Sequence, residues 1–403
     1  MLLVLQRNIY RRIKKTFPQY STQLASLAAK YVNIRANILY PFKAKRYTER
    51  LENIVKKSNT KVIFLYPSPV EWNFELFQRP HHFALNLAKQ NYLFFFVLPF
   101  IDYKSNHGFR KIKPNLYTVS LEAINCFKKY QVDHLLISPK IDMKLLVNKL
   151  KHKHLLYDYM DDLSVWEWGT SEHGVSSDNF MKTNADKIIV SADRLFDDVI
   201  DHKNKVVLCK NGVDFDHFHS FSIKPPKNDA IFFKSLKGPN IGYYGALANW
   251  IDFKLIRFIA KNNKNYNIIL IGLDADNFIE KEKLNNFHNI YFLGPKKYSL
   301  LPWYLSQFDV AIIPFKNGDI SDSTSPLKLF EYMAGGKPVV TTNMKECKKY
   351  DEVLVSRTYE DFNLNLKKAL KIKTDKNFIK RLKNTAIHNS WKDRIKTLIN
   401  SLE

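Results

Sequence analysis

The feature that most constrains the fold is an alternation of short apolar runs with segments of helical spacing. In the stretch 77–90, for example, Phe83 and Leu87 fall on one face of a helix, beside the small pair Ala84 and Ala88. Strands that alternate with helices predict a parallel sheet with helices on both of its faces. The apolar runs of this first series are 61–67, 92–99, 116–120, 134–138, 154–159 and 187–191.

A second series of the same kind follows residue 230. Its helical stretches are expected near 252–261, 298–307 and 326–334. Between the two series, residues 222–230 contain Pro and Lys without periodicity, which is typical of a linker. The apolar runs of the second series are 240–245, 267–272, 289–294, 309–315 and 337–342.

The order of these segments predicts two doubly wound α/β domains, at 58–222 and 230–385. A basic helical extension, 1–57, precedes them, and a helical segment, 386–403, follows them. A chain of 403 residues, of which 45% are hydrophobic, is long enough for two such cores.

The charge of the chain points to an anionic partner. The formal net charge is +24, which suits a phosphorylated substrate, a nucleic acid or a membrane surface. The alternative is a compositional drift toward Lys and Asn. Aromatic residues fall in expected core strands and are not interleaved with basic ones, so nucleic acid is the least favoured of the three.

Cysteine usage and hydropathy bear on the cellular location. Cys126, Cys209 and Cys347 lack metal or redox spacing, which favours a reducing cytosol. The longest apolar run, 92–101, is about half of the roughly 20 residues that a membrane-spanning helix needs.

The first 17 residues combine apolar and basic side chains. The apolar run is too short for a signal peptide, and the charges follow it instead of preceding it. Leu2, Leu5, Ile9 and Ile13 recur near one helical face. This pattern fits a basic helix at a membrane interface or, equally, an amphipathic helix packed on the protein.

The most informative stretch is SDSTSPLKLFEYMAGGKPVVTT, residues 321–342. Ser325 and Pro326 form a helix-start signal, with the Ser as cap and the Pro as first helical residue. Gly335-Gly336 is a helix-end signal, which requires one left-handed residue. Lys328 and Glu331 then lie on one face at the open N-terminal end of the helix.

This arrangement suits a nucleoside diphosphate. A helix N-terminus offers N–H groups and partial positive charge to phosphate, and Lys328 adds a full charge. Glu331 lies one turn deeper and can accept two hydrogen bonds, as a ribose diol requires. The alternative is a solvated Lys–Glu pair on an ordinary capped helix.

Five segments, in order, resemble motifs of GT-B glycosyltransferases, especially bacterial enzymes of capsule, teichuronic acid and other cell-surface polysaccharide assembly. The 321–342 stretch is similar to their nucleotide-sugar signature, SPLKLFEYMAxGKPVV. Together the resemblances extend from about residue 60 to 345. The other four are WNFELFQRPHH (72–82, similar to a QRPxH motif), LLYDYMDDLSVW (155–166), VVLCKNGVDFDHF (206–218) and IGYYGALANWIDFKLI (241–256).

The resemblance implies two facing Rossmann-like domains with the active site in the cleft. The donor binds the C-terminal domain, the acceptor binds the N-terminal domain, and the last helix, with Trp391, crosses back to the first domain. Glu331 matches the residue that holds the donor ribose. Lys328 and the Ser325–Leu327 backbone are expected to hold the diphosphate, and Gly242 and Gly245 to let the backbone approach the phosphates.

Two departures leave the stereochemical outcome open. Many retaining members have a second Glu eight positions before the ribose-binding one, where this chain has Ser323. Many also have basic residues after the glycine loop, which reads GALANWID here. Lys328 is expected to take over that role.

The N-terminal motifs suggest acceptor-side residues. Arg79, His81 and His82 lie at an expected strand-to-helix entry, where doubly wound sheets bind ligands. His82 matches the family His and is a catalytic candidate; the alternative is that Arg79 and His82 make capping hydrogen bonds.

An acidic cluster follows the expected strand at 154–159. Asp161 and Asp162 are candidates for a general base if the enzyme inverts, or else cap the next helix, and Asp158 is an acceptor-side candidate.

Metal patterns are weak. The DAD of 274–276 resembles a metal-binding DxD, but GT-B enzymes rarely use one, and the His pairs of 152–154 and 217–219 lack an evident third ligand. We therefore expect no metal and no cofactor apart from the UDP- or GDP-linked sugar donor.

The predicted protein is thus a glycosyltransferase at the inner face of the cytoplasmic membrane, acting on a glycan that is lipid-linked. A sugar-nucleotide epimerase and a non-catalytic scaffold with a degenerate site are the alternatives.

Overall fold

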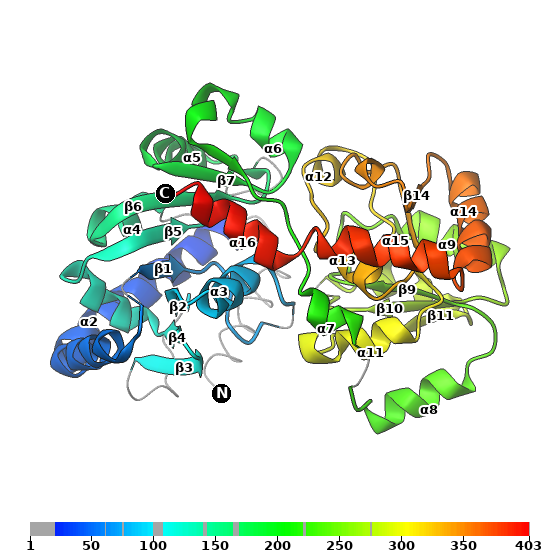
Figure 1. Cartoon of the computed structure of the whole chain (residues 1–403), viewed down its shortest axis with the longest axis horizontal. Helices are drawn as coiled ribbons and strands as arrows, with labels where there is room; N and C mark the ends of the chain where they lie inside the picture. The colour runs from blue at the N-terminus through cyan, green and yellow to red at the C-terminus, as the bar shows by residue number, and fades with distance from the viewer. Residues whose placement is uncertain are drawn as a thin grey trace. The chain divides into compact units, whose positions relative to one another are not determined.

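A computed structural model describes residues 21–60, 62–74, 76–99, 108–139, 143–163, 169–220, 223–274 and 276–402 (Figure 1). The chain divides into two compact units. The first unit comprises the described residues up to Trp72, then Ala84–Ile189 and Asp201–Val206. The second comprises Asn73–Phe83, Val190–Ile200 and the chain from Val207 onward. The amphipathic pattern predicted for residues 2–17 lies outside the described residues.

An eight-stranded sheet, in the order β3-β4-β2-β1-β5-β6-β7-β8, forms the first half of the chain. Neighbours from β4 to β6 are parallel, and only the edge pair of β3 and β4 is antiparallel among the registered pairs of the described strands. Every residue of β1 and β2 is buried, which explains why both read as unbroken apolar runs. The strands are β1 (Ile63–Pro67), β2 (Leu93–Val97), β3 (Phe109–Lys113), β4 (Leu116–Val119), β5 (Val132–Ile137), β6 (His152–Tyr159), β7 (Lys187–Val190) and β8 (Val206–Leu208).

The helix α2 (Ser21–Lys57) covers the described part of the predicted basic extension. Its C-terminal half packs on the 3-10 helix η2 (Leu121–Lys128), where the Tyr47 hydroxyl donates to Glu122 Oε1 at 3.1 Å. Tyr47, Leu51 and Ile54 are buried. This half of the extension is therefore an integral part of the first unit. The other helices of this half are α3 (Arg79–Lys89), α4 (Met143–Lys149) and α5 (Glu172–Asn184).

The second unit is built on a six-stranded sheet in the order β11-β10-β9-β12-β13-β14, with every registered pair parallel. This order is the doubly wound arrangement that the second series of apolar runs predicted. Its strands are β9 (Asn240–Tyr244), β10 (Asn267–Ile271), β11 (Ile290–Phe292), β12 (Val310–Ile313), β13 (Val339–Thr341) and β14 (Val353–Val355). The main helices around it are α9 (Phe253–Asn262), α11 (Leu301–Ser306), α13 (Leu327–Ala334) and α14 (Tyr359–Ile372).

The linker prediction for 222–230 is wrong in its last part, because α8 (Lys227–Ser235) begins there. The helix is held by the buried ring of Phe233, which lies 5.6 Å from Trp303 and 6.3 Å from Tyr304, centroid to centroid. Aromatic packing that comes from distant residues leaves no periodicity in the segment itself.

The predicted C-terminal segment, 386–403, contains the last two residues of α15 (Lys376–Ile387) and the whole of α16 (Trp391–Asn400). The break falls at Ser390, whose hydroxyl accepts from Asp393 N at 3.2 Å and so caps α16. Trp391, fully buried, stacks on His82 at 4.8 Å within the second unit. No helix in the described ranges is both long enough and apolar enough to cross a membrane.

Candidate functional site

The helix α13 presents the most informative stretch of the sequence. Pro326 is extended (φ −73°, ψ 114°) and is the N-cap residue, and its carbonyl accepts from Leu329 N at 3.1 Å. The prediction that the Ser325 side chain caps the helix is therefore wrong by one residue. At the other end, Gly336 has φ of +67°, which confirms the predicted left-handed stop.

Lys328 and Glu331 form an unusual pair at the start of this helix. Burial raises the pKa of Glu331 to about 7, against the opposing effects of Tyr244 and Lys328. Burial lowers the pKa of Lys328 to about 8, against the opposing effect of Glu331. Among the described residues, neither side chain takes part in an ion pair. The Lys328 ammonium lies over the rings of Phe315, at 4.9 Å, and Tyr243, at 5.5 Å. Charged groups that are desolvated without an ion-pair partner are typical of binding sites.

Two tyrosines that the sequence analysis missed complete this cluster. The hydroxyls of Tyr244 and Tyr298 are both buried: that of Tyr244 interacts with the Glu331 carboxylate, and that of Tyr298 has no hydrogen-bond partner in the described part of the chain. The pKa of each is raised, mainly by burial and next by the charge of Glu331. The available signal was the position of Tyr244 at the carboxyl end of a predicted strand, where doubly wound sheets bind ligands.

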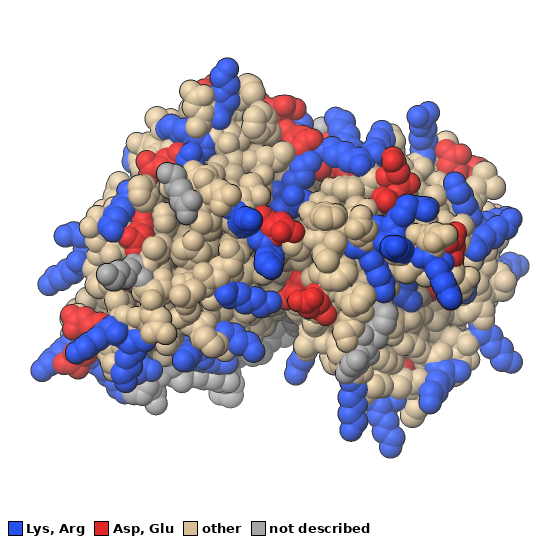
Figure 2. All heavy atoms as spheres, viewed as in Figure 1, with Lys and Arg blue, Asp and Glu red and all other residues tan. Residues whose placement is uncertain are grey.

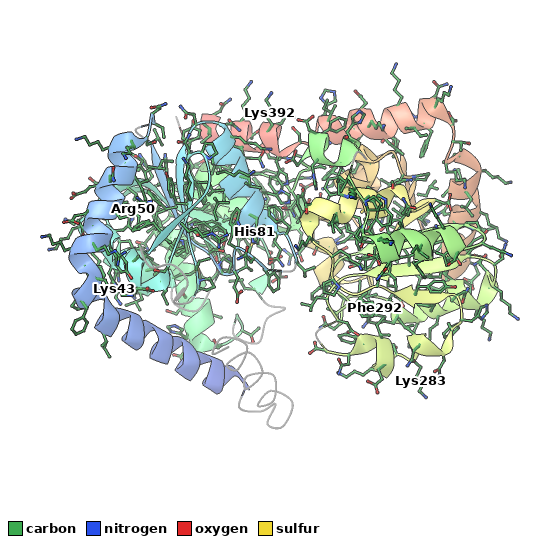
Figure 3. The ribbon with its side chains drawn as sticks, turned by 90° about the horizontal axis from the view of Figure 1, so that it is seen from below. Lys43, Arg50, His81, Lys283, Phe292 and Lys392 are labelled. Carbon is green, nitrogen blue, oxygen red and sulfur yellow. The ribbon has the colours of Figure 1, made fainter. Side chains whose placement is uncertain are left out.

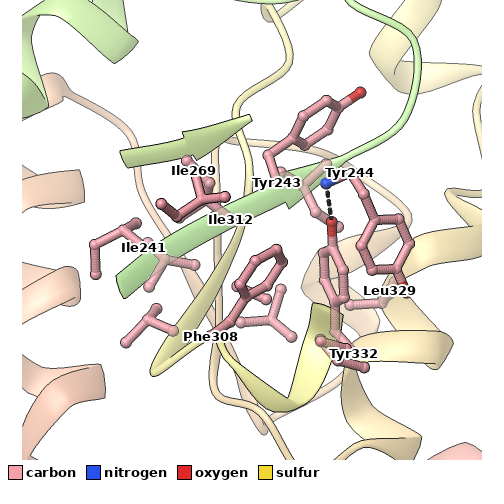
Figure 4. Close-up of a cluster of buried hydrophobic side chains, with 14 of the residues drawn as sticks. Ile241, Tyr243, Tyr244, Ile269, Phe308, Ile312, Leu329 and Tyr332 are labelled. Atoms are coloured by element: carbon pink, nitrogen blue, oxygen red, sulfur yellow. Dashed lines mark hydrogen bonds between the residues drawn. The ribbon is translucent and has the colours of Figure 1, made fainter. Parts of the chain in front are cut away.

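Tyr244 itself is held firmly. Its main-chain N–H donates to the Tyr332 hydroxyl at 3.0 Å, and the two rings meet edge to face at 4.8 Å (Figure 4). Figure 4 also shows Tyr243 and Tyr244 extending to opposite sides of β9. The two rings therefore contact α13 at different residues: Tyr244 packs on Tyr332, and the Tyr243 ring lies 5.5 Å from Lys328 Nζ.

The two predicted phosphate-loop glycines have different surroundings. Gly242 lies within β9, and a Cβ there would come within 2.2 Å of the Phe308 ring, so packing accounts for this glycine. Gly245 follows the strand with φ of +145°, and a Cβ there would lie 3.0 Å from Lys328 Cε. Gly245 is therefore the one that brings main chain close to the Lys328 side chain.

The other predicted segments of the second unit meet at Asn211. Arg79, buried at the start of α3, donates from Nη1 to the Cys209 carbonyl at 2.8 Å and to Asn211 Oδ1 at 3.2 Å. Asn211 Nδ2 in turn donates to the Ser325 carbonyl at 2.6 Å. The QRPHH, NGVD and SPLKLFE segments are thus joined by side-chain hydrogen bonds.

The two histidines of QRPHH are both buried (Figure 3 labels His81). His81 Nδ1 accepts from Gln78 N at 3.1 Å, so a capping role is seen at His81. The His82 ring stacks on Trp391 and lies 5.5 Å from the Tyr298 ring. A catalytic role for His82 stays a prediction.

The acidic candidates belong to the first unit. Asp158 is fully buried at the end of β6, whereas Asp161 is exposed and Asp162 is partly exposed. The helix α5 is capped by Ser171, which accepts from Gly174 N at 3.1 Å. The alternative that Asp161 and Asp162 cap a helix that follows them directly stays a prediction. Their role as a general base stays a prediction.

The weak metal patterns have local structural explanations. The Asp274 carboxylate accepts from Phe278 N at 2.6 Å and from Ile279 N at 3.0 Å, at the start of a short helix. His154 stacks on His134 at 5.4 Å, and His217 Nε2 lies 3.1 Å from the Tyr298 carbonyl. No cluster of three or more potential metal ligands occurs among the described residues.

Comparison with known proteins identifies the fold and one domain. Residues 238–371 match the family described as glycosyl transferases group 1. The chain is 29% identical over 218 residues to TuaH of Bacillus subtilis, a protein named for teichuronic acid biosynthesis and as a glycosyltransferase. That match spans 51% of this chain and 54% of the relative, about half of each.

Solved GT-B structures match over most of the chain. Sucrose-phosphate synthase from Thermosynechococcus elongatus superposes with a TM-score of 0.65 at 13% identity, covering 85% of this chain and 99% of that one. HepE of Anabaena, solved in complex with UDP, superposes with a TM-score of 0.60 at 14% identity, with the same coverage of both chains. The chain therefore has the GT-B fold that the resemblance implied.

Proposed function

We propose that this chain, whose residues 238–371 are a group 1 glycosyltransferase domain in a GT-B fold, moves a sugar from a nucleotide diphosphate sugar to a glycan hydroxyl. The observation that supports this most is the buried Lys328–Glu331 pair, with the buried hydroxyls of Tyr244 and Tyr298 near its carboxylate. A buried site that gathers an ammonium, a carboxylate and two hydroxyls is suited to a polyhydroxyl, polyphosphate ligand.

The donor is assigned to residues of the second unit. Glu331 accepts from the ribose diol, and Lys328 faces the diphosphate together with the N–H groups at the start of α13. Gly245 allows the backbone after β9 to approach the same phosphates. We favour a UDP-linked sugar as the first donor to test, because HepE was solved with UDP.

The reaction loosens the C–O bond between sugar and diphosphate. Positive charge develops at the sugar carbon, and negative charge develops on the leaving phosphate. With a pKa of about 8, Lys328 is mostly protonated at pH 7 and stabilises the leaving group from a fixed position. The acceptor hydroxyl bonds to the sugar carbon and gives its proton to a base, for which Asp161, Asp162 and His82 are the candidates.

We further propose that the acceptor is a lipid-linked glycan of a cell-surface polysaccharide and that the enzyme works at the inner leaflet. TuaH, the relative named for teichuronic acid, supports the polysaccharide class. Membrane contact is assigned to α2, where Phe42 is 84% exposed and Ile38 is 59% exposed, one turn apart. Lys45 and Arg46 are exposed beside them, a combination typical of helices that bind anionic membrane surfaces.

A non-catalytic scaffold is the second candidate. Ser323, which is buried, stands where many retaining members have a Glu, and the GALANWID loop lacks basic residues. An epimerase would share the donor site. Incubation with labelled UDP-sugar and a glycan acceptor separates the three, because only a transferase moves label into the glycan and only an epimerase converts the labelled UDP-sugar to its epimer.

The first test is a thermal-shift panel with UDP, GDP, dTDP and CMP. A ligand at a hundred times its dissociation constant adds about 2.7 kcal/mol to the folded state. We expect UDP to stabilise the wild type but not Glu331→Ala. Asp309→Asn is the matched control, since Asp309 accepts from Asn240 N at the opposite, amino-terminal edge of the same sheet. Failure of every nucleotide to shift the wild type would leave only the scaffold.

A further inference from the structure

We propose that Arg79 and Asn211 are positioning residues for the sugar donor. They hold the peptide that leads into α13 and thereby aim Lys328 and the first N–H groups of the helix at the diphosphate. This inference rests on the proposed function. It also reassigns Arg79, which the resemblance placed on the acceptor side.

The main chain around Asn211 is fixed on both sides. Cys209 N donates to the Val190 carbonyl at 2.9 Å. Val213 makes two main-chain hydrogen bonds with residues at the start of α16. Its N–H donates to the Asn389 carbonyl at 3.1 Å, and its carbonyl accepts from Trp391 N at 3.0 Å. Between these anchors, a Cβ on Gly212 would come within 2.8 Å of the Asn389 oxygen. The amide of Asn211 therefore extends from a well-anchored backbone.

The orientation of that amide follows from its partners. A guanidinium is a donor only, so the oxygen of the amide must face Arg79 and its NH₂ must face Ser325. Arg79 is itself held by the Cys209 carbonyl, and its guanidinium carbon lies 4.4 Å from the centroid of the Phe83 ring. Arg79 thus fixes which end of the amide reaches the donor helix.

The peptide that Asn211 holds is the last one before the helix. Ser325 is followed by Pro326, which has no N–H, so the Ser325 carbonyl is the polar group through which this peptide can be held. Lys328 belongs to the first turn of the helix, three residues after Ser325. Releasing the carbonyl allows the first turn to shift, and positioned electrostatic groups lose effect with small displacements.

The test compares the affinities of UDP and UMP by calorimetry on the purified full chain. Arg79 and Asn211 act on the part of the site where the second phosphate is expected. Asn211→Ala should therefore weaken UDP binding about tenfold, the size of one buried hydrogen bond to a polar group, and weaken UMP binding much less. Arg79→Lys should show a smaller loss in the same direction. The double variant should be no weaker than Asn211→Ala alone, because both act through one bond.

Asn263→Ala is the matched control. Asn263 is also a buried asparagine that donates to a main-chain carbonyl, that of Ile259 at 2.9 Å, at the end of α9. It should lower stability and keep the wild-type preference for UDP over UMP. If Asn211→Ala and Arg79→Lys keep the wild-type preference for UDP over UMP, the positioning role of Arg79 and Asn211 is overturned. If the wild type binds no nucleoside diphosphate, the proposed donor site is overturned, and with it the positioning role of Arg79 and Asn211.

Discussion

Glu331 illustrates at the residue scale how a binding site is maintained at a cost to stability. Its pKa is raised from the usual 4.5 to about 7, so between these values the folded chain holds a proton that the unfolded chain releases. The stability linked to this group is therefore complete below pH 4.5 and falls as the pH rises through 7. Glu331→Gln removes the linkage, so the variant should gain stability over the wild type as pH rises from 5 to 7.5. Urea unfolding at the two values measures this, and a difference that does not vary with pH would contradict it.

Tyr298 should separate stability from binding. Tyr298→Phe deletes a buried hydroxyl that has no hydrogen-bond partner in the described structure, so the melting temperature should stay level or rise. Binding of UDP should weaken several-fold if the ligand pairs with that hydroxyl. The discrimination between UDP and its 2′-deoxy analogue should shrink as well.

A matched tyrosine gives the opposite expectation. The fully buried ring of Tyr304 directs its hydroxyl to Asp229, away from the Glu331 cluster. Tyr304→Phe should cost about 1 kcal/mol of stability and leave UDP affinity unchanged. Equal behaviour of the two variants would remove Tyr298 from the site.

At the scale of elements, Lys337 joins the end of α11 to the start of β13. Its ammonium donates to the carbonyls of Ser306 at 2.9 Å and Phe308 at 2.7 Å, and so satisfies groups left open at a helix C-terminus. Lys337→Met should therefore lower the free energy of unfolding by about 1–3 kcal/mol. The control is Lys373→Met, which breaks an ion pair with Asp309 that is part exposed and so worth about 1 kcal/mol or less. If the two variants lose equal free energies of unfolding in urea denaturation, the hydrogen bonds of Lys337 contribute no more to stability than the partly exposed ion pair of Lys373.

The helices and strands were the part of the structure that the sequence predicted best. Fully buried parallel strands are continuous apolar runs, so β1, β2, β9, β10 and β12 were visible directly. The left-handed Gly336 and the strand after it followed from local chemistry in the same way. The helix α8 was missed because its support comes from Trp303 and Tyr304, far along the chain.

The candidate site was predictable only where it is local. Lys328 and Glu331 share one helix, so their spacing revealed them. Tyr298 and Asn211 come from other segments, and their relevance depends on contacts between distant parts of the chain. For the same reason the Arg79–Asn211 bond could not be predicted, although each residue lies in a segment singled out in the sequence.

At the scale of the whole molecule, charge is the dominant property. Lys and Arg are spread over the face seen in Figure 2 and do not gather in one patch. A net charge of +24 gives general attraction to anionic surfaces, and the charges on this face mark no single point of contact. Orientation requires a local feature, and the exposed apolar pair on α2 provides one.

We therefore expect binding to liposomes with anionic lipids to depend on both properties in different ways. Raising the salt concentration should weaken binding generally, since screening acts on all surface charges. Lys45→Ala with Arg46→Ala should weaken it about thirtyfold, at about 1 kcal/mol for each basic residue near the surface. Phe42→Ala should weaken binding at every salt concentration, because inserting an apolar ring is not screened.

Phe292→Ala is the control for the aromatic contribution. Phe292 is 39% exposed on β11 of the second unit, far along the chain from α2 (Figure 3). If it weakens co-sedimentation as much as Phe42→Ala does, binding has no preferred face, and α2 loses its assigned role. If only the α2 variants lose binding while UDP affinity stays intact in all of them, membrane attachment and donor binding belong to separate parts of the chain. An assay with a lipid-linked acceptor would then slow with Phe42→Ala, while an assay with a soluble acceptor would not.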